Sequence, residues 1–251
     1  MNQGFPPHFD GPLHQQLHQR VTTEIALRVI RAANENGGST AFTEATLCRQ
    51  LGVGRSVVRE AIKVLAAKGL VAVRKKQGMR VRPRHHWQLS DPDVLRWLGK
   101  AGPNLRLIVD LYEIRAILEP AAAELTAMRA TSEHIAAIEA AYRQMACANG
   151  RNKKYITADV EFHYSILSGV GNDLLSYVAR TTICEALRYS FEFGSKACPS
   201  AIELDLKLHR AVAEAIANRD AKAARTATIR LVETSRASLS KTLKGKKSLM
   251  T

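Results

Sequence analysis

Three side chains in the second half of the sequence have the types and spacing that a divalent-metal site requires. Asp159 and His163 lie four residues apart, so on a helix predicted over 153–169 they would share one inward, largely apolar face. His209 shares the apolar face of a helix predicted over 200–218. One carboxylate and two imidazoles that face a core suit zinc, nickel or manganese, with coordination positions left open for a ligand.

Other interpretations of these three residues stay open. A lone inward histidine is more often a core residue with a hydrogen-bonding partner than a metal ligand. Without a metal, Asp159, His163 and His209 would hydrogen-bond directly to the hydroxyl groups of a polyol ligand. As catalytic residues they would suit a metal-dependent hydrolase, but no obvious nucleophile motif or general base accompanies them in the sequence.

Arg115 is a further candidate functional residue. In a helix predicted over 104–129, it lies within the apolar stripe that includes Leu111 and Leu118. A buried guanidinium needs an anionic partner, because an unpaired charge is costly to remove from water. That partner is either Glu119, one turn further along the helix, or the carboxylate of a bound ligand.

A short amphipathic helix with a basic flank is the third feature. The stretch GRSVVREAIKVL predicts a helix over 55–68 with a buried stripe made of Val58, Ala61, Ile62 and Leu65. At about 100° per residue, the flank beside this stripe carries Arg55, Ser56, Arg59 and Lys63. An arginine fork can bind guanine O6 and N7 in the major groove or clamp phosphates, so this basic flank suits DNA recognition.

The elements around this helix predict a winged helix-turn-helix over 13–83. A helix over 13–35 and a short helix capped by Thr43 precede the basic flank. The stretch LVAVRKKQGMRVRPR then predicts a hairpin, the wing, over 70–82. The wing would offer to DNA the residues Lys75, Lys76, Gln77, Gly78 and Arg80.

The charge distribution supports a polyanionic partner for this first part of the chain. Residues 1–90 carry 14 Lys and Arg against 5 Asp and Glu, and the remaining residues carry 23 against 18. The first third therefore holds +9 of the net charge of +14. Basic charge concentrated in one small domain favours binding to a phosphate backbone.

The remainder of the chain predicts a helical domain. A linker is predicted over 84–92, and long amphipathic helices with short connections then predict an antiparallel bundle over 93–242. Residues 1–12 are expected to form a flexible leader and residues 243–251 a basic tail. The predicted fold class is therefore mainly α, with an N-terminal winged helix-turn-helix and a C-terminal helical bundle.

The sequence also bears on the cellular compartment. No run of 18 apolar residues predicts a membrane span, and the first residues lack the pattern of a secretory signal. The four cysteines, at positions 48, 147, 184 and 198, form neither a CxxC pair nor a regular framework. A reduced, cytoplasmic environment is the expectation that these features support.

The stretch LGVGRSVVREAIKVLAAKGLVAVRKKQGMRV resembles the winged helix of the GntR family of transcription regulators. With the helical remainder, it resembles the FadR subgroup, whose C-terminal FCD domain binds a small carboxylate effector. The resemblance implies a homodimer on a short palindromic operator, with Arg55 and Arg59 as DNA-contacting arginines and Gly78 as the wing-tip glycine. Two positions depart from the family pattern: Gly54 replaces a capping hydroxyl residue, and Ala45 replaces a third DNA-contacting arginine.

The resemblance also bears on the effector. The family motif E-x-R-x-x-L-E is present from Glu113 to Glu119 and implies that Arg115 binds the effector carboxylate. Many FCD domains complete their metal site with a further histidine, where this chain has Leu231, so the implied ligand set is incomplete. Ser235, one turn later, would face the same cavity.

These observations together predict a DNA-binding transcriptional regulator, a repressor of a carbon-catabolism operon, and no enzyme. The stretches WQLSDPDVLRWL and TEATLCRQL resemble family members that respond to sugar acids such as galactonate. One alternative is an architectural DNA-binding protein without a ligand, and the other is the metal-dependent hydrolase. A ligand-induced change in DNA affinity would separate the regulator from the architectural protein.

Overall fold

A computed structural model describes the chain over residues 13–36, 41–74, 78–102, 105–148, 152–193 and 199–248. The chain divides into two compact units, residues 1–103 and residues 104–251, and each is described by itself. The predicted leader, residues 1–12, lies outside the described residues, as do the predicted wing residues Lys75, Lys76 and Gln77.

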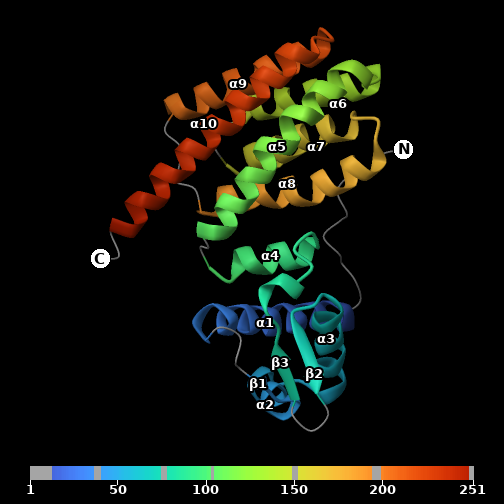
Figure 1. Ribbon diagram of the computed structural model, residues 1–251, viewed down its shortest axis with the longest axis vertical. Coiled ribbons are helices and arrows are strands. Elements are labelled where there is room, and N and C mark those ends of the chain that lie inside the picture. The colour runs from blue at the N-terminus through green and yellow to red at the C-terminus, as the bar shows by residue number, and fades with distance from the viewer. Residues whose placement is uncertain are drawn as a thin grey trace. The chain divides into compact units, whose positions relative to one another are not determined.

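The first unit has the predicted winged helix-turn-helix (Figure 1). In chain order its elements are α1 (Leu13–Asn36), β1 (Ala41–Phe42), α2 (Glu44–Leu51), α3 (Arg55–Ala67), β2 (Val71–Arg74), β3 (Gly78–Val81), the 3-10 helix η1 (Arg84–His86) and α4 (Pro92–Lys100). The stripe predicted for α3 is buried as expected and packs mainly on α1 and α2. This packing holds α3 in place by its apolar side and leaves its other flank exposed.

Local sequence signals decide where α2 and α3 begin and end. Thr43 caps α2 by accepting a hydrogen bond at Oγ1 from the backbone nitrogen of Thr46, 3.2 Å away. Gly52 ends α2 in the left-handed region, at φ 63°. Gly54 precedes α3 without a side-chain cap, so its first backbone N–H groups lack that partner.

The wing is part of a three-stranded sheet, with one strand more than the predicted hairpin. β3 pairs antiparallel with β2 and also with β1, whose two residues are too few to give a periodic signal. Gly78 lies at φ 77°, and a Cβ there would be 2.5 Å from the carbonyl oxygen of Phe42. The contact between β1 and β3 therefore requires glycine at this position, independently of any contact with DNA.

The segment over 84–92 differs from the linker that the sequence predicts. Trp87 is buried and donates from Nε1 to the carbonyl oxygen of Arg82, and Gln88 donates to the carbonyl oxygen of Ala67. α4 then packs on α1, where Trp97 Nε1 lies 3.3 Å from Thr23 Oγ1. The first compact unit therefore includes α4, although the sequence predicts that residues from 93 onward belong to the bundle.

Asp91 is expected to stabilise the first unit through two contacts. Its carboxylate caps α4 by accepting hydrogen bonds from the backbone nitrogens of Asp93 and Val94, and it forms an ion pair with Lys68. Replacing Asp91 with alanine should lower the free energy of unfolding by about 1–2 kcal/mol, the cost of a lost cap.

Urea unfolding followed by tryptophan fluorescence would measure this effect, because both tryptophans of the chain, Trp87 and Trp97, lie in the first unit. Asp91→Asn keeps a capping oxygen but loses the charge, so it should cost less than the alanine variant. If Asp91→Ala and the unaltered protein had the same free energy of unfolding, Asp91 would not stabilise the first unit as expected.

The second unit is an all-helical bundle in the residues that the structure describes (Figure 1). Its helices are α5 (Leu105–Arg129), α6 (Ser132–Cys147), α7 (Lys153–Ser168), α8 (Asp173–Phe193), α9 (Pro199–Ala217) and α10 (Ala221–Ser248). The predicted boundary between bundle and basic tail at 242 falls inside α10, because the helix continues to Ser248. In the part of the chain described, no helix is long and apolar enough to cross a membrane.

α5 is the central helix of this bundle and contacts α7, α8, α9 and α10. Such a position buries α5 on several sides, which explains why its polar residues Arg115 and Glu119 are only 1% and 3% exposed. Phe162 of α7 and Val212 of α9 belong to the same apolar core. The inward faces predicted for the helices that carry Asp159, His163 and His209 therefore meet beside α5.

Candidate functional site

The basic flank of α3 is exposed along its predicted length, with Arg55, Ser56, Arg59 and Lys63 all accessible. Arg59 is paired within the unit, because its Nε lies 2.8 Å from Oε2 of Glu44 on α2. Lys63 similarly pairs with Glu60 at 2.8 Å. Among the described residues, Arg55 has no ion-pair partner. Exposed ion pairs contribute about 0–1 kcal/mol, so a DNA phosphate or base could replace either glutamate as partner.

The wing contributes less that can be described. Arg80 lies on β3, exposed, and opposite Ala41 and Ala72 on the neighbouring strands. Because Arg80 is exposed, its guanidinium is accessible to an anionic partner. Gly78, also predicted to contact DNA, has the structural role described above.

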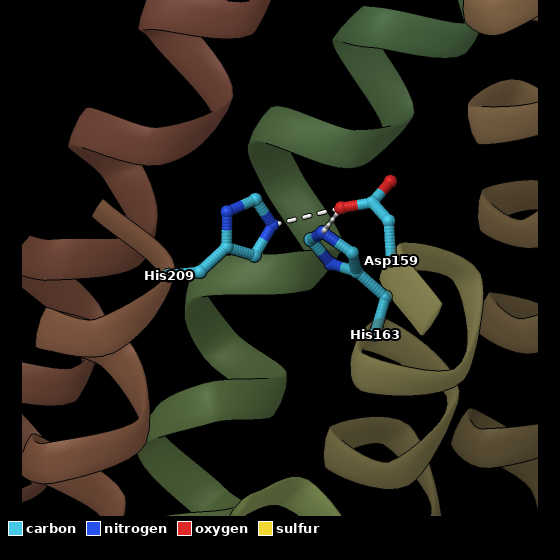
Figure 2. Close-up of side chains that lie close together, drawn as sticks. All are labelled: Asp159, His163 and His209. Atoms are coloured by element: carbon cyan, nitrogen blue, oxygen red, sulfur yellow. Dashed lines mark ion pairs between the residues drawn. The ribbon is translucent and has the colours of Figure 1, made fainter. Parts of the chain in front are cut away.

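In the second unit, Asp159, His163 and His209 meet in the core, as Figure 2 shows. His209 Nε2 lies 2.9 Å and His163 Nε2 lies 3.8 Å from the same oxygen, Oδ1 of Asp159. All three side chains are at most 4% exposed. Two ligands bound about 2.0–2.1 Å from a tetrahedral zinc ion lie about 3.3–3.4 Å apart, a spacing that the two observed distances bracket.

The other nitrogen of each histidine ring, Nδ1, lies within 3.0 Å of an oxygen. His209 Nδ1 donates to the backbone carbonyl oxygen of Asp205 at 2.8 Å, and Tyr155 donates from its hydroxyl to Oδ2 of Asp205 at 2.5 Å. His163 Nδ1 lies 3.0 Å from Oε2 of Glu119, but this buried oxygen makes no aligned hydrogen bond. A hydrogen bond at Nδ1, as in His209, orients the ring and leaves Nε2 as the ligating nitrogen of a metal-binding histidine.

Arg115 has an internal partner, which is one of the two possibilities that the sequence left open. Its Nε donates to Oε1 of Glu119 at 2.6 Å, and both side chains are buried. Burial alone would raise the pKa of Glu119, but the charges of Arg115 and His163 outweigh it and lower the pKa to about 2. Glu119 therefore stays an anion and lies between Arg115 and His163.

The buried atoms of this polar cluster (Arg115, Glu119, Asp159, His163 and His209) fit a cation. Burial lowers the pKa of His209, but Asp205 and Asp159 outweigh it and raise the pKa to about 9. Despite its 2.9 Å approach to Asp159, Nε2 of His209 makes no aligned hydrogen bond and is fully buried. A divalent metal would replace the proton between these atoms, so the donor set Asp159, His163 and His209 fits a metal ion.

A small cavity of about 10 Å³ adjoins the cluster, with room for about one water molecule. Glu119 and His163 line it from one side, and Thr228 and Leu231 of α10 line it from the other. Ser235 is not among the lining side chains: it lies four residues after Leu231, about 6 Å further along α10, and is partly exposed. The structure thus brings together every predicted effector residue except Ser235.

The sequence predicted Glu119 only as a partner of Arg115. It did not predict the contacts of Glu119 with His163, of Asp205 with His209 and of Glu44 with Arg59. Asp205 is four residues before His209, a helical spacing that could have suggested their proximity. Glu44 is fifteen residues from Arg59, and no periodic signal links them.

Comparison with known proteins decides the family. Residues 15–81 match the bacterial regulatory proteins of the gntR family, and residues 110–234 match the FCD domain. The galactonate operon transcriptional repressor of Escherichia coli K12 is 32% identical to this chain over 198 residues, which cover 79% of this chain and 86% of the repressor. The chain belongs to the GntR family. Its predicted identity as a DNA-binding transcription regulator with an FCD domain is thereby confirmed.

Other known proteins are also similar to this chain. The Uxu operon transcriptional regulator of Escherichia coli K12 is 28% identical over 229 residues, 85% of this chain and 82% of that regulator. A solved structure of Lar, which controls the expression of the Listeria monocytogenes agr system, shares the fold with a TM-score of 0.61 at 17% sequence identity. The aligned region covers 93% of this chain and 99% of the Lar chain. The relatives are regulators, which agrees with the prediction that the GntR-family chain is no enzyme.

Proposed function

We propose that this GntR-family protein represses an operon for the catabolism of a sugar acid and releases its operator when it binds that acid. The observation that carries the proposal is the buried polar cluster in the bundle of a protein whose other domain binds DNA. A relative named as the galactonate operon repressor makes galactonate the first effector to test. Such a regulator acts on the chromosome, so we place it in the cytoplasm.

On the DNA side, we propose that a homodimer binds a palindromic operator through two copies of α3. Arg55 and Arg59 would contact base edges or phosphates, and Ser56, Lys63 and the wing would add phosphate contacts. The wing residues of this proposal are Lys75, Lys76, Gln77, Gly78 and Arg80. With Ala45 exposed on α2 where the family pattern has an arginine, base recognition depends more strongly on Arg55 and Arg59.

On the effector side, Asp159, His163 and His209 would hold a divalent metal such as zinc, nickel or manganese. A metal held there supplies an electropositive centre for a carboxylate and a neighbouring hydroxyl of the effector. Arg115 supports this centre indirectly, because its guanidinium is already neutralised by Glu119. In the carboxylate role first predicted for Arg115, the effector would share the guanidinium with Glu119, whose buried 2.6 Å contact already neutralises its charge.

The cavity beside the cluster explains how binding could be coupled to DNA affinity. At about 10 Å³ it is far too small for a sugar acid, so the effector requires α10 to move away from α5 and α7. The ligand would therefore favour a bundle arrangement different from the one described. It can lower DNA affinity only to the extent that it binds this second arrangement more tightly.

A paired screen of ligand binding and operator release tests the proposal. At a concentration about 100 times its dissociation constant, an effector stabilises the folded state by about 2.7 kcal/mol, a rise in Tm of about 5–10 °C. D-galactonate and other sugar acids should produce this rise and weaken binding to an operator selected from random DNA. Neutral D-galactose serves as the matched control and should do neither.

If no sugar acid changes either the Tm or the DNA affinity, while operator binding itself is intact, the effector part of the proposal is wrong. The protein would then bind DNA without this class of ligand. Failure to select any operator would instead count against the DNA-binding assignment of α3.

A further inference from the structure

We infer that the outward face of α10 is a second DNA-binding surface, which contacts the phosphate backbone of a duplex without reading its sequence. Such a contact goes beyond the proposed function, because it is separate from α3 and needs neither a metal nor an effector. Three features of α10 support it: the charge of the helix, the lack of ion-pair partners for several described cations, and the packing of the helix in the bundle.

The positive charge of the second unit is concentrated in α10. The 28 residues of this helix contain eight Lys and Arg against one Asp or Glu, whereas residues 104–220 contain 13 against 15. α10 therefore carries a charge of +7, and the part of the unit that precedes it carries −2. Charge of one sign gathered on one helix attracts a polyanion, which releases its condensed counterions on binding.

The cations of α10 share one side of the helix. Lys222, Arg230 and Arg236 are exposed, and at about 100° per residue they fall within a sector of about 120°. The sequence continues this sector with the positions of Lys244 and Lys247. From position 222 to position 247 the helix rises about 38 Å, which is close to one turn of B-DNA, about 34–36 Å.

Several of these cations lack the ion pairs that are found elsewhere in the bundle. On other helices, three exposed arginines pair with a carboxylate four residues away: Arg106, Arg143 and Arg210. By contrast, Lys222, Arg230 and Arg236 have no ion-pair partner among the residues that the structure describes. A phosphate can therefore approach these three cations without displacing a carboxylate.

Helix stability does not explain the position of these cations. Because of the helix dipole, basic residues stabilise the last turn of a helix and are unfavourable in its first turn. Lys222 lies in the first turn of α10, and Arg230 lies near the middle. Their placement therefore favours a role in binding an anion over a role in forming the helix.

The packing and composition of α10 indicate which polyanion it suits. Its apolar side, which includes Ala224, Leu231 and Leu239, is buried, and the helix contacts α5 and α9. A helix that binds a membrane surface inserts its apolar side into the lipid, and here that side is already packed. Single-stranded nucleic acid is bound by stacking its bases on aromatic side chains, and α10 contains no aromatic residue. The phosphates of a DNA duplex are the polyanion that fits.

The salt dependence of DNA binding by the full chain tests this inference. The α10 variant combines Lys222→Gln, Arg230→Gln and Arg236→Gln. Each phosphate contact contributes about 0.9 to the slope of log K against log salt concentration, so three lost contacts should make the slope shallower by about 2.7 per protomer. Between about 50 and about 200 mM salt, the unaltered protein would then lose about 40-fold more affinity than the variant.

The same change in slope is expected on an operator duplex and on a duplex of unrelated sequence, because phosphates carry no sequence information. The matched control removes equal charge from other helices of the bundle, by Arg106→Gln, Arg143→Gln and Arg210→Gln. It should leave the slope nearly unchanged, since these arginines are ion-paired. Circular dichroism should show that both variants are as helical as the unaltered protein.

Two outcomes of the salt titration would overturn the inference. An α10 variant with the slope of the unaltered protein would show that this face contacts no phosphate. An equal change of slope in the control would show that net charge, and not the face of α10, is responsible. Binding to phosphatidylserine vesicles that is weakened in the α10 variant, with the slope on DNA unchanged, would assign the face to a membrane and would also overturn the inference.

The phosphates could belong to the operator duplex or to a second duplex, and two further measurements separate these sources. If α10 contacts the operator duplex, the difference between variant and unaltered protein should grow when that duplex is extended by about 20 base pairs, two helical turns, on each side. If α10 contacts a second duplex, energy transfer between two labelled duplexes should appear with the unaltered protein and be lost in the variant. Either result supports the inference.

The measurement on a duplex of unrelated sequence needs no operator and no effector. Failure of the proposed function would therefore leave that measurement intact. Conversely, an unchanged slope in the α10 variant would overturn the inference and leave the response to a sugar acid untouched.

Discussion

Replacing Arg55 and Arg59 together with alanine is expected to abolish specific DNA binding and leave both units folded. Both side chains are exposed near the start of α3, and neither contributes to the buried stripe. A bidentate contact from arginine to guanine is worth about 1–3 kcal/mol, so losing two should lower operator affinity by about 30-fold or more. Binding to unrelated DNA should fall less, because phosphate contacts from the wing remain.

Titration of an operator selected from random DNA, at several salt concentrations, would measure both effects. The matched control is Arg143→Ala with Arg210→Ala, which removes two exposed, ion-paired arginines from the second unit. It should change operator affinity little. Near-normal specific binding by the Arg55 and Arg59 double variant would show that another surface reads the operator.

Asp159→Asn is expected to remove metal binding almost completely. Asp159 is the side chain that both histidines approach, at 2.9 Å and 3.8 Å. The substitution keeps the size of the side chain but removes its charge, so a divalent cation would meet two neutral imidazoles and an amide. We expect zinc affinity to fall by about 100-fold or more, since even outer partners of a ligand are worth 10- to 100-fold.

Elemental analysis of purified protein and zinc titration would measure this loss. Asp110→Asn is the matched control, because Asp110 lies in an exposed ion pair with Arg106 on α5. That control should bind zinc like the unaltered protein. If the unaltered protein neither retains nor takes up a divalent metal, Asp159, His163 and His209 would instead bind hydroxyl groups of the effector directly.

In the first unit, the sequence alone was sufficient to predict the helices and the exposure of the basic flank of α3. Periodic apolar residues and capping signals such as Thr43 and Gly52 are local, so they can be recognised without knowledge of the fold. The sheet contact between β1 and β3, the packing of α4 and the pairing of Glu44 with Arg59 were not predicted. Each of these joins residues that are distant in the chain, where periodicity carries no information.

In the second unit, the sequence by itself determined that Arg115, Asp159, His163 and His209 face inward. Helical spacing places them on buried faces, and the cost of burying charge implies that they find partners. Only the tertiary structure decided which partners these are. The packing of α7 and α9 against α5 brings Asp159 to both histidines and places Glu119 between Arg115 and His163. The direction in which a ring nitrogen points depends on side-chain torsions and on neighbouring helices, and a one-dimensional pattern does not encode either of them.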